Sequence, residues 1–168
     1  LSLQYSLVVT LVLLFFSFFV YYFSYTSQLN RFRESLLESA KNTAILLIDV
    51  KEVDSTLLKK IHSSTIKLDE EEVMLTDTAF HPVYSNNVHH LQPDLIRDHY
   101  ASGDIEFFSY REKDGVLYKH RFQGKTFYVY VMAADPARRE NLSELMEILA
   151  WSSAISILLS ILLSYLFS

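Results

Sequence analysis

The six histidines are the side chains of this chain best suited to bind a metal ion or to change charge near neutral pH. Imidazole suits both zinc and copper, and four histidines fall close together with carboxylates that could complete a site. However, no two histidines have the i, i+4 spacing that places them on one face of a helix. We therefore expect solvated loop residues and no metal site, with a metal site and a pH-responsive cluster as alternatives. The residues concerned are His81, His89, His90, His99, Asp94, Asp98 and Glu106.

Other arrangements that carry chemistry are missing from the sequence. There is no cysteine, which excludes a thiol nucleophile and a zinc finger in this segment. There is no glycine-rich phosphate loop and no Ser/His/Asp arrangement that the spacing supports. The acidic run 69–72 is interpreted as a solvated turn rather than a catalytic pair. We predict no catalytic residue and no cofactor, and the net charge of −5 argues against binding to nucleic acid.

Aromatic and cationic side chains are interleaved in the later part of the hydrophilic region. An aromatic sheet face with a few cations is what a small anionic or aromatic ligand needs. The same composition describes a half-buried antiparallel sheet without a ligand, because tyrosine, phenylalanine and valine favour strands. Both interpretations stay open at this stage. The predicted ligand-binding residues are Tyr110, Arg111, Tyr118, His120, Tyr128 and Tyr130.

The charged residues are confined to the middle of the chain. All 15 Lys and Arg and all 20 Asp and Glu lie within 31–147. Crossing a hydrocarbon core takes roughly 20 apolar helical residues, and the segments 7–23 and 148–168 meet that length. Tyrosines at the end of the first segment and Trp151 in the second match an aromatic belt. The expected segments are a transmembrane helix at 1–25, a hydrophilic domain at 26–146 and a transmembrane helix at 147–168.

The first apolar segment continues without glycine or proline into an amphipathic stretch, which predicts one nearly continuous helix over 5–50. Apolar residues recur there in steps of three or four, which is typical of a dimer seam and equally of a helix packed on its own domain. In the second span, serines recur every four residues and would let helices approach closely in lipid. The predicted dimer and signalling positions are Leu29, Phe32, Leu36, Ser156 and Ser160.

Between the spans, strand and helix patterns alternate. Asp-Gly supplies the positive φ angles of a type I′ turn, so we expect a hairpin turn at 113–115. A second turn is expected at Gln-Gly-Lys, 123–125. Asp135-Pro136 is typical of a helix start and predicts that the exit helix begins there. The expected elements are a helix at 54–63, strands at 72–77 and 83–86, a helix at 93–102, and strands at 105–112, 116–122 and 126–134.

The last strand has two apolar faces by alternation. Phe127, Val129, Val131 and Ala133 fall on one face, and Tyr128, Tyr130 and Met132 fall on the other. We expect one face to pack on the long helix. The predicted fold class is therefore α+β, with an antiparallel sheet and a long N-terminal helix between two transmembrane helices.

The layout resembles the extracytoplasmic PAS-like (PDC or Cache-related) sensor region of bacterial two-component transmembrane sensor histidine kinases. The likeness is carried by the span–domain–span order, the long helix leaving the first span, EVMLTDTAFHPVYSN at 72–86 and FYVYVMAADPARRENLSELMEIL at 127–149. A glycine usual in the first hairpin turn of that family is replaced by the segment 79–82, Ala-Phe-His-Pro.

The resemblance implies a signal-sensing input module that acts as a parallel homodimer in the cell (inner) membrane. It implies a two-pass topology with residues 26–146 outside the cytoplasm, an unidentified small-molecule or protein stimulus, and a cognate response regulator. Because the chain begins with Leu and ends within an apolar run, we expect the kinase to lie beyond Ser168. The alternatives are the input region of a chemoreceptor or nucleotide cyclase, and a two-span envelope protein-interaction module.

Overall fold

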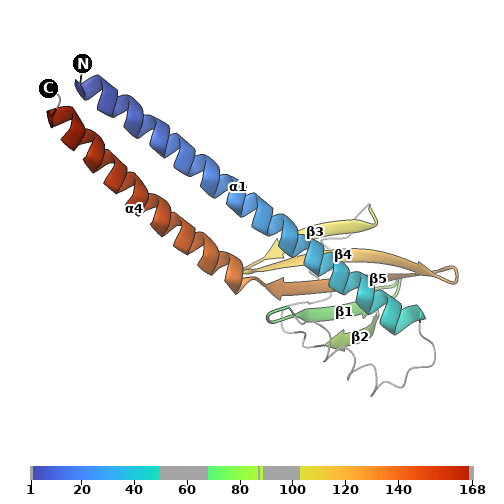
Figure 1. The fold of residues 1–168 in the computed structure, drawn as a ribbon. Coiled ribbons are helices and arrows are strands. Elements are labelled where there is room, and N and C mark those ends of the chain that lie inside the picture. The colour runs from blue at the N-terminus through green and yellow to red at the C-terminus, as the bar shows by residue number, and fades with distance from the viewer. Residues whose placement is uncertain (1, 50–67, 87, 89–102, 167–168) are drawn as a thin grey trace. The chain divides into compact units, whose positions relative to one another are not determined.

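The fold, seen in a computed structural model, consists of long helices and one antiparallel sheet. The structure describes residues 2–49, 68–86, 88 and 103–166 (Figure 1). The predicted helices at 54–63 and 93–102 lie outside the described residues. The described elements are α1 (Ser2–Ala44), the π-helical turn η1 (Ile45–Asp49), β1 (Glu72–Thr76), β2 (Pro82–Asn86), β3 (Ile105–Tyr110), β4 (Lys113–Phe122), β5 (Lys125–Ala134) and α4 (Pro136–Leu166).

Two compact units share these elements. The helix pair comprises residues 2–30 of α1 together with α4, and the sheet unit comprises residues 31–135. Both α1 and α4 contain a segment long and apolar enough to cross a membrane, which suggests a membrane protein. The prediction of one long N-terminal helix is confirmed, because α1 and η1 together run from Ser2 to Asp49 without a break.

The sheet has five strands in the order β2-β1-β5-β4-β3. All neighbouring strands are antiparallel, so the chain is of the α+β class, as predicted. β5 is the central strand: it pairs along its whole length with β4 on one side, and residues 128–132 pair with β1 on the other. The hairpin between β4 and β5 turns at Gln123-Gly124, where both φ angles are positive, as a type I′ turn requires.

The predicted hairpin turn at 113–115 is wrong. Tyr110 pairs with Lys113, so the chain turns at the two residues 111 and 112, and Arg111 has a φ of 55°. Lys113 to Gly115 instead belong to β4. Gly115 has another role: a Cβ at this position would lie 2.4 Å from Cζ of Phe108, which faces it on β3. The glycine therefore makes room for an aromatic ring across the strand pair.

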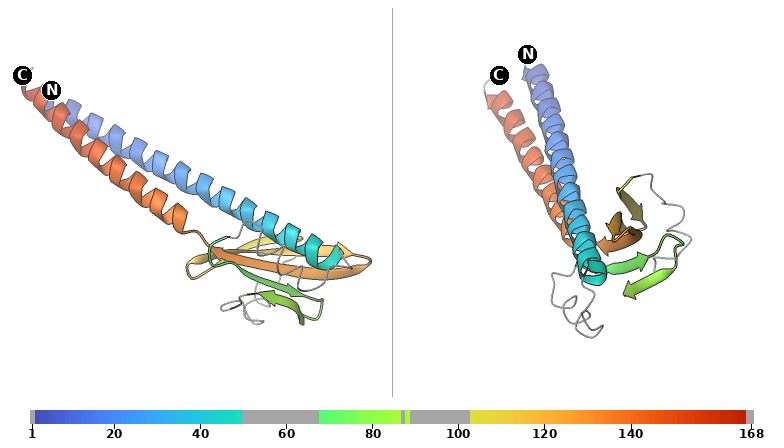
Figure 2. Two further views of the ribbon diagram at one scale, coloured as in Figure 1. Left: turned by 60° about the horizontal axis from the view of Figure 1, so that its bottom comes forward. Right: turned by 90° about the vertical axis from the view of Figure 1, so that its right-hand side faces the viewer.

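Alternation along β5 gives the sheet two apolar faces, as predicted. The helix face carries Val73, Leu75, Val116, Val129, Val131 and Ala133, and it packs on α1 and η1 through Leu36, Ala40, Ala44 and Ile48. The second face carries Met74, Phe108, Leu117, Tyr128, Tyr130 and Met132. Figure 2 shows the cyan part of α1 lying along one face of the sheet. Small side chains at positions 40 and 44 allow this helix to approach the sheet closely.

Candidate functional site

The end of β5 from which the chain enters α4 carries a buried ion pair. Lys113 on β4 and Glu72 on β1 both belong to the second face by alternation, and β5 runs between these two strands. The Lys113 Nζ atom lies 2.9 Å from Oε1 of Glu72, so the lysine side chain passes over the last residues of β5. Lys113 is directly paired with Ala134, whose small side chain leaves space for this crossing. We call this ion pair the strap.

All three protons of the Lys113 ammonium have an acceptor. Besides Glu72, the Nζ atom lies 3.2 Å from Oε2 of Glu70 and 3.1 Å from the Glu70 carbonyl oxygen. The Glu72 side chain is fully buried, while 12% of the Lys113 side chain and 72% of the Glu70 side chain are exposed. Burial alone would lower the pKa of Lys113, but the hydrogen bonds and negative charges of Glu72 and Glu70 outweigh it and hold that pKa above 10.5.

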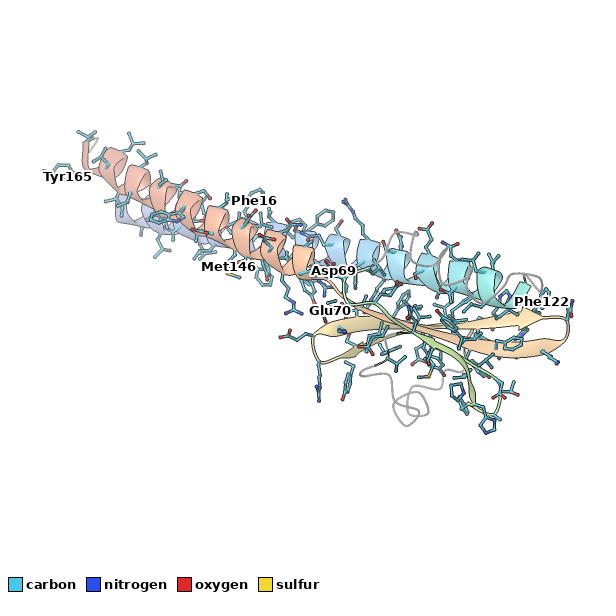
Figure 3. The ribbon with its side chains drawn as sticks, turned by 90° about the horizontal axis from the view of Figure 1, so that it is seen from below. Phe16, Asp69, Glu70, Phe122, Met146 and Tyr165 are labelled. Carbon is cyan, nitrogen blue, oxygen red and sulfur yellow. The ribbon has the colours of Figure 1, made fainter. Side chains whose placement is uncertain are left out.

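Backbone contacts fix the same end of β5. The Ala134 N–H donates to the carbonyl oxygen of Asp69 at 2.9 Å, which extends the β1 side of the ladder by one bond beyond Glu72. Next to it, the Ser39 hydroxyl on α1 donates to Oε1 of Glu71 at 2.5 Å. Asp69 and Glu70 lie at one end of the sheet, opposite the hairpin end marked by Phe122 (Figure 3). Side chains or backbone of α1, β1, β4 and β5 therefore meet where β5 ends.

The interpretation of 69–72 as a solvated acidic turn is correct for Asp69 and Glu70, which are exposed, and wrong for Glu72, which is fully buried. Glu70 also has a φ of 50°, the left-handed conformation of a tight turn. The sequence contained a weak signal for this difference. Glu72 stands two residues before Met74 on the same strand face, and its buried charge requires a cation from another strand.

The predicted ligand-binding residues are divided between the two faces of the sheet. Tyr118 packs against the helix-face core, and the ring of His120 lies 6.0 Å from that of Tyr118. Tyr128 and Tyr130 are buried in the second face, with Tyr110 packed against them. Arg111 lies in the β3–β4 turn, with its guanidinium 5.4 Å from the centre of the Tyr110 ring. The structure therefore brings Tyr110, Arg111, Tyr128 and Tyr130 to one face and separates Tyr118 and His120 from them; their role in ligand binding stays a prediction.

A buried hydroxyl group lies on the same second face. Thr76 is 1% exposed, and its Oγ1 atom has no hydrogen-bond partner within the part of the chain that the structure describes. It is paired across the ladder with Tyr128, whose ring stacks on Phe80 at 5.8 Å. Sequence reasoning did not single out Thr76, because a threonine in a strand is an ordinary finding.

The predicted dimer seam lies partly inside the sheet unit. Leu36 is completely buried and belongs to the core that α1 forms with the helix face of the sheet. Phe32 is partly buried against the same core, while Leu29 belongs to the helix pair and is partly buried there. The alternative of a helix packed on its own domain therefore accounts for Leu36. Contact of these residues with a second subunit stays a prediction.

Within the helix pair, α1 and α4 run antiparallel, with both chain ends at the same end of the pair (Figure 1). A contact joins them at Ser17 and Ser153, whose hydroxyl oxygens are 3.2 Å apart. Ser156 and Ser160 are partly buried, and the Ser156 hydroxyl donates to the carbonyl oxygen of Ser152 on its own helix. Buried or partly buried side chains of α4 recur in steps of three or four, with Ile157 beside Ser156 as a further one; the recurring residues are Arg138, Leu142, Leu145, Leu149, Ser153, Ser156 and Ser160.

The register of the helix pair aligns the ends of the two apolar segments. With Ser17 level with Ser153 in an antiparallel pair, Phe23 lies level with Glu147 because both helices rise equally per residue. Phe23 ends the first predicted span, and Glu147 is the last charged residue before the second. The arginine side chain of Arg138 lies outside both spans, 6.0 Å from the ring of Tyr25. Two spans of a hairpin through one bilayer require such an alignment.

Of the six histidines, the structure describes His81 and His120. Among the described residues, no group of three or more His, Asp or Glu side chains is arranged to hold a metal ion. His81 lies beside Asp77 in the β1–β2 turn, where Nδ1 and Oδ2 are 3.6 Å apart. Backbone N–H groups of His81 and Ala79 donate to the Asp77 carboxylate, and the first of these is the main reason that its pKa is lowered. His89, His90 and His99, with Asp94 and Asp98, lie outside the described residues.

No protein-family model, curated protein or solved structure matches this chain.

Proposed function

We propose that this chain is the signal-sensing input module of a membrane-bound two-component sensor histidine kinase. In this proposal the sheet unit is a PAS-like domain on the extracytoplasmic side of the cell (inner) membrane, and the helix pair crosses the membrane twice. The module acts as a parallel homodimer and passes a stimulus through α4 to a kinase and its response regulator. The chain itself carries out no chemistry.

One observation carries the proposal. The central strand of the sheet, β5, leads through the single residue Asp135 into α4, which contains the second candidate span. Pro136 occupies the first position of that helix, where its missing N–H costs no hydrogen bond. No flexible linker therefore separates β5 from the apolar helix, so a displacement of β5 would be passed on to α4. This connection is what a relay from an outer domain to a cytoplasmic output needs.

A chimera tests the proposal. The full chain, 1–168, is fused to the cytoplasmic half of a histidine kinase of known output, and one to four residues are inserted at the junction in a series. Because a relayed helix displacement depends on the helical phase, autophosphorylation in membrane vesicles should rise and fall with a period of about 3.6 inserted residues. The same activity at every insertion length would contradict the proposal.

The coding sequence after Ser168 and the same chimera distinguish the sensor kinase from its alternatives. A methyl-accepting hairpin or a cyclase domain encoded after Ser168 would keep the input module and replace the output. A protein-interaction module predicts capture of a protein partner by the sheet unit and a chimera whose kinase activity does not depend on phase.

A further inference from the structure

The strap is an unusual way to close the end of a sheet. A fully buried carboxylate is costly to remove from water, and a buried ion pair is often no more stabilising than apolar side chains of similar size. Yet Glu72 is completely buried, and its lysine partner comes from two strands away in the sheet. In the middle of the same face, the corresponding positions are apolar, namely Met74 and Leu117. The charge pair is therefore confined to the end of β5.

We propose that the strap is a latch that holds the last residues of β5 against β1 and β4, and that its opening releases the connection from β5 to α4. The signalling role of the latch rests on the proposed function. Opening of the latch would be the step at which that function is regulated. In the closed state the Lys113 ammonium contacts both Glu72 and Glu70. In the open state it keeps only Glu70 and leaves Glu72.

Two features of the site make a second state accessible. Glu70 is 72% exposed and supplies both a carboxylate and a carbonyl oxygen to Lys113, so the ammonium keeps acceptors at the surface when it leaves Glu72. The ladder with β4 continues to Ala134, but the ladder with β1 ends at Met132, so the closed state depends on few bonds on the β1 side. Beyond the Glu72–Met132 pair, the bond from the Ala134 N–H to the Asp69 carbonyl is the one backbone bond that holds β5 on the β1 side among the residues that the structure describes. Local opening of a strand end is the kind of fluctuation that few bonds permit.

Removal of the lysine charge should open the latch selectively. In Lys113→Met, the buried carboxylate of Glu72 is left without its cation, so hydrogen exchange of the amides at 132–134 should accelerate by about tenfold or more. Exchange at 128–130, in the middle of the same strand, should change by less than about twofold. The full chain is measured in lipid nanodiscs, with Lys125→Met as the matched control because Lys125 is the exposed lysine at the other end of β5.

A second variant separates a latch from a plain folding defect. Glu72→Leu combined with Lys113→Met replaces the ion pair by two apolar side chains and leaves no buried charge, so exchange at 132–134 should return to within about twofold of the native rate. Equal acceleration along the whole of β5 in the single variant, or none, would overturn the proposal. A double variant that exchanges as fast at 132–134 as the single one would overturn it as well.

The latch and the proposed function fail in different ways. Selective exchange at 132–134 together with a phase-independent chimera would leave the latch in place and remove its signalling role. A phase-dependent chimera together with uniform exchange would keep the sensor function and remove the latch.

Discussion

Replacement of Leu36 by alanine decides whether this residue is a core residue of one chain or part of a seam between two. Leu36 is fully buried between α1 and the helix face of the sheet. The substitution removes three buried carbon atoms, and buried Leu→Ala changes cost about 2–5 kcal/mol. For a unit of this size the melting midpoint should fall by on the order of 10–20 °C. Ile45→Ala is the matched control, since Ile45 is 49% exposed and should cost no more than about 0.5 kcal/mol.

The assay is thermal unfolding of the full chain in detergent, followed by near-ultraviolet circular dichroism of the tyrosines. Tyr128 and Tyr130 are buried in the sheet, so their signal reports loss of its packing. The measurement is made at two protein concentrations that differ tenfold. A core role predicts the same fall in the midpoint at both concentrations. A native midpoint with weakened, concentration-dependent dimerisation would refute our assignment of Leu36 to the core.

Two further predictions follow from single contacts. Gly115→Ala should lower the free energy of unfolding by about 1–3 kcal/mol, because its Cβ would overlap the Phe108 ring. In urea denaturation, adding Phe108→Leu to the same chain should recover part of that loss. Full additivity of the two free-energy changes would contradict the overlap. The chain has no cysteine of its own, so two cysteines can be introduced without competing thiols. Ser17→Cys with Ser153→Cys should form a disulfide within one chain, seen as a mobility shift of the monomer on a non-reducing gel. A product of dimer size alone would contradict the antiparallel pair.

The strands and their faces could be predicted because each depends on a local pattern. Alternation in β5 placed Val129 on one face and Tyr130 on the other, and a buried central strand keeps both faces apolar. The exit helix was predictable because Asp135-Pro136 is a local start signal. Five strands and a long helix followed from such patterns. Their order in the sheet did not, since pairing of β1 with β5 joins residues far apart in the sequence.

The turn that was predicted at Asp114-Gly115 and is absent there shows how tertiary packing overrides a local rule. Asp-Gly has the conformational freedom that a type I′ turn needs, but the same two residues can also adopt the extended conformation of a strand. Here Gly115 lies in β4, and its lack of a side chain leaves space for the Phe108 ring. The turn lies at 111–112, where Arg111 has a positive φ. A sequence pattern alone does not distinguish a glycine needed for its φ angle from one needed for space.

The strap was missed for a related reason. Glu72 stands in a run of four acidic residues, and such a run is ordinarily solvated. Its burial depends on Lys113, which is 41 residues away in the sequence and is brought close only by the strand order β1-β5-β4. The strap thus depends on the order of the strands in the sheet, which local sequence patterns do not determine.

The burial of Leu36 also constrains the predicted dimer. A helix that gives one stripe to its own sheet must offer another to a second subunit. On α1, the exposed positions within the sheet unit include Glu34, Glu38 and Lys41, in steps of four and three. In a parallel homodimer with this stripe at the axis, each glutamate would lie near its own copy, which like-charge repulsion disfavours. Leu29 is apolar and belongs to the helix pair, so any dimer contact along α1 should centre near Leu29 and weaken toward Glu38.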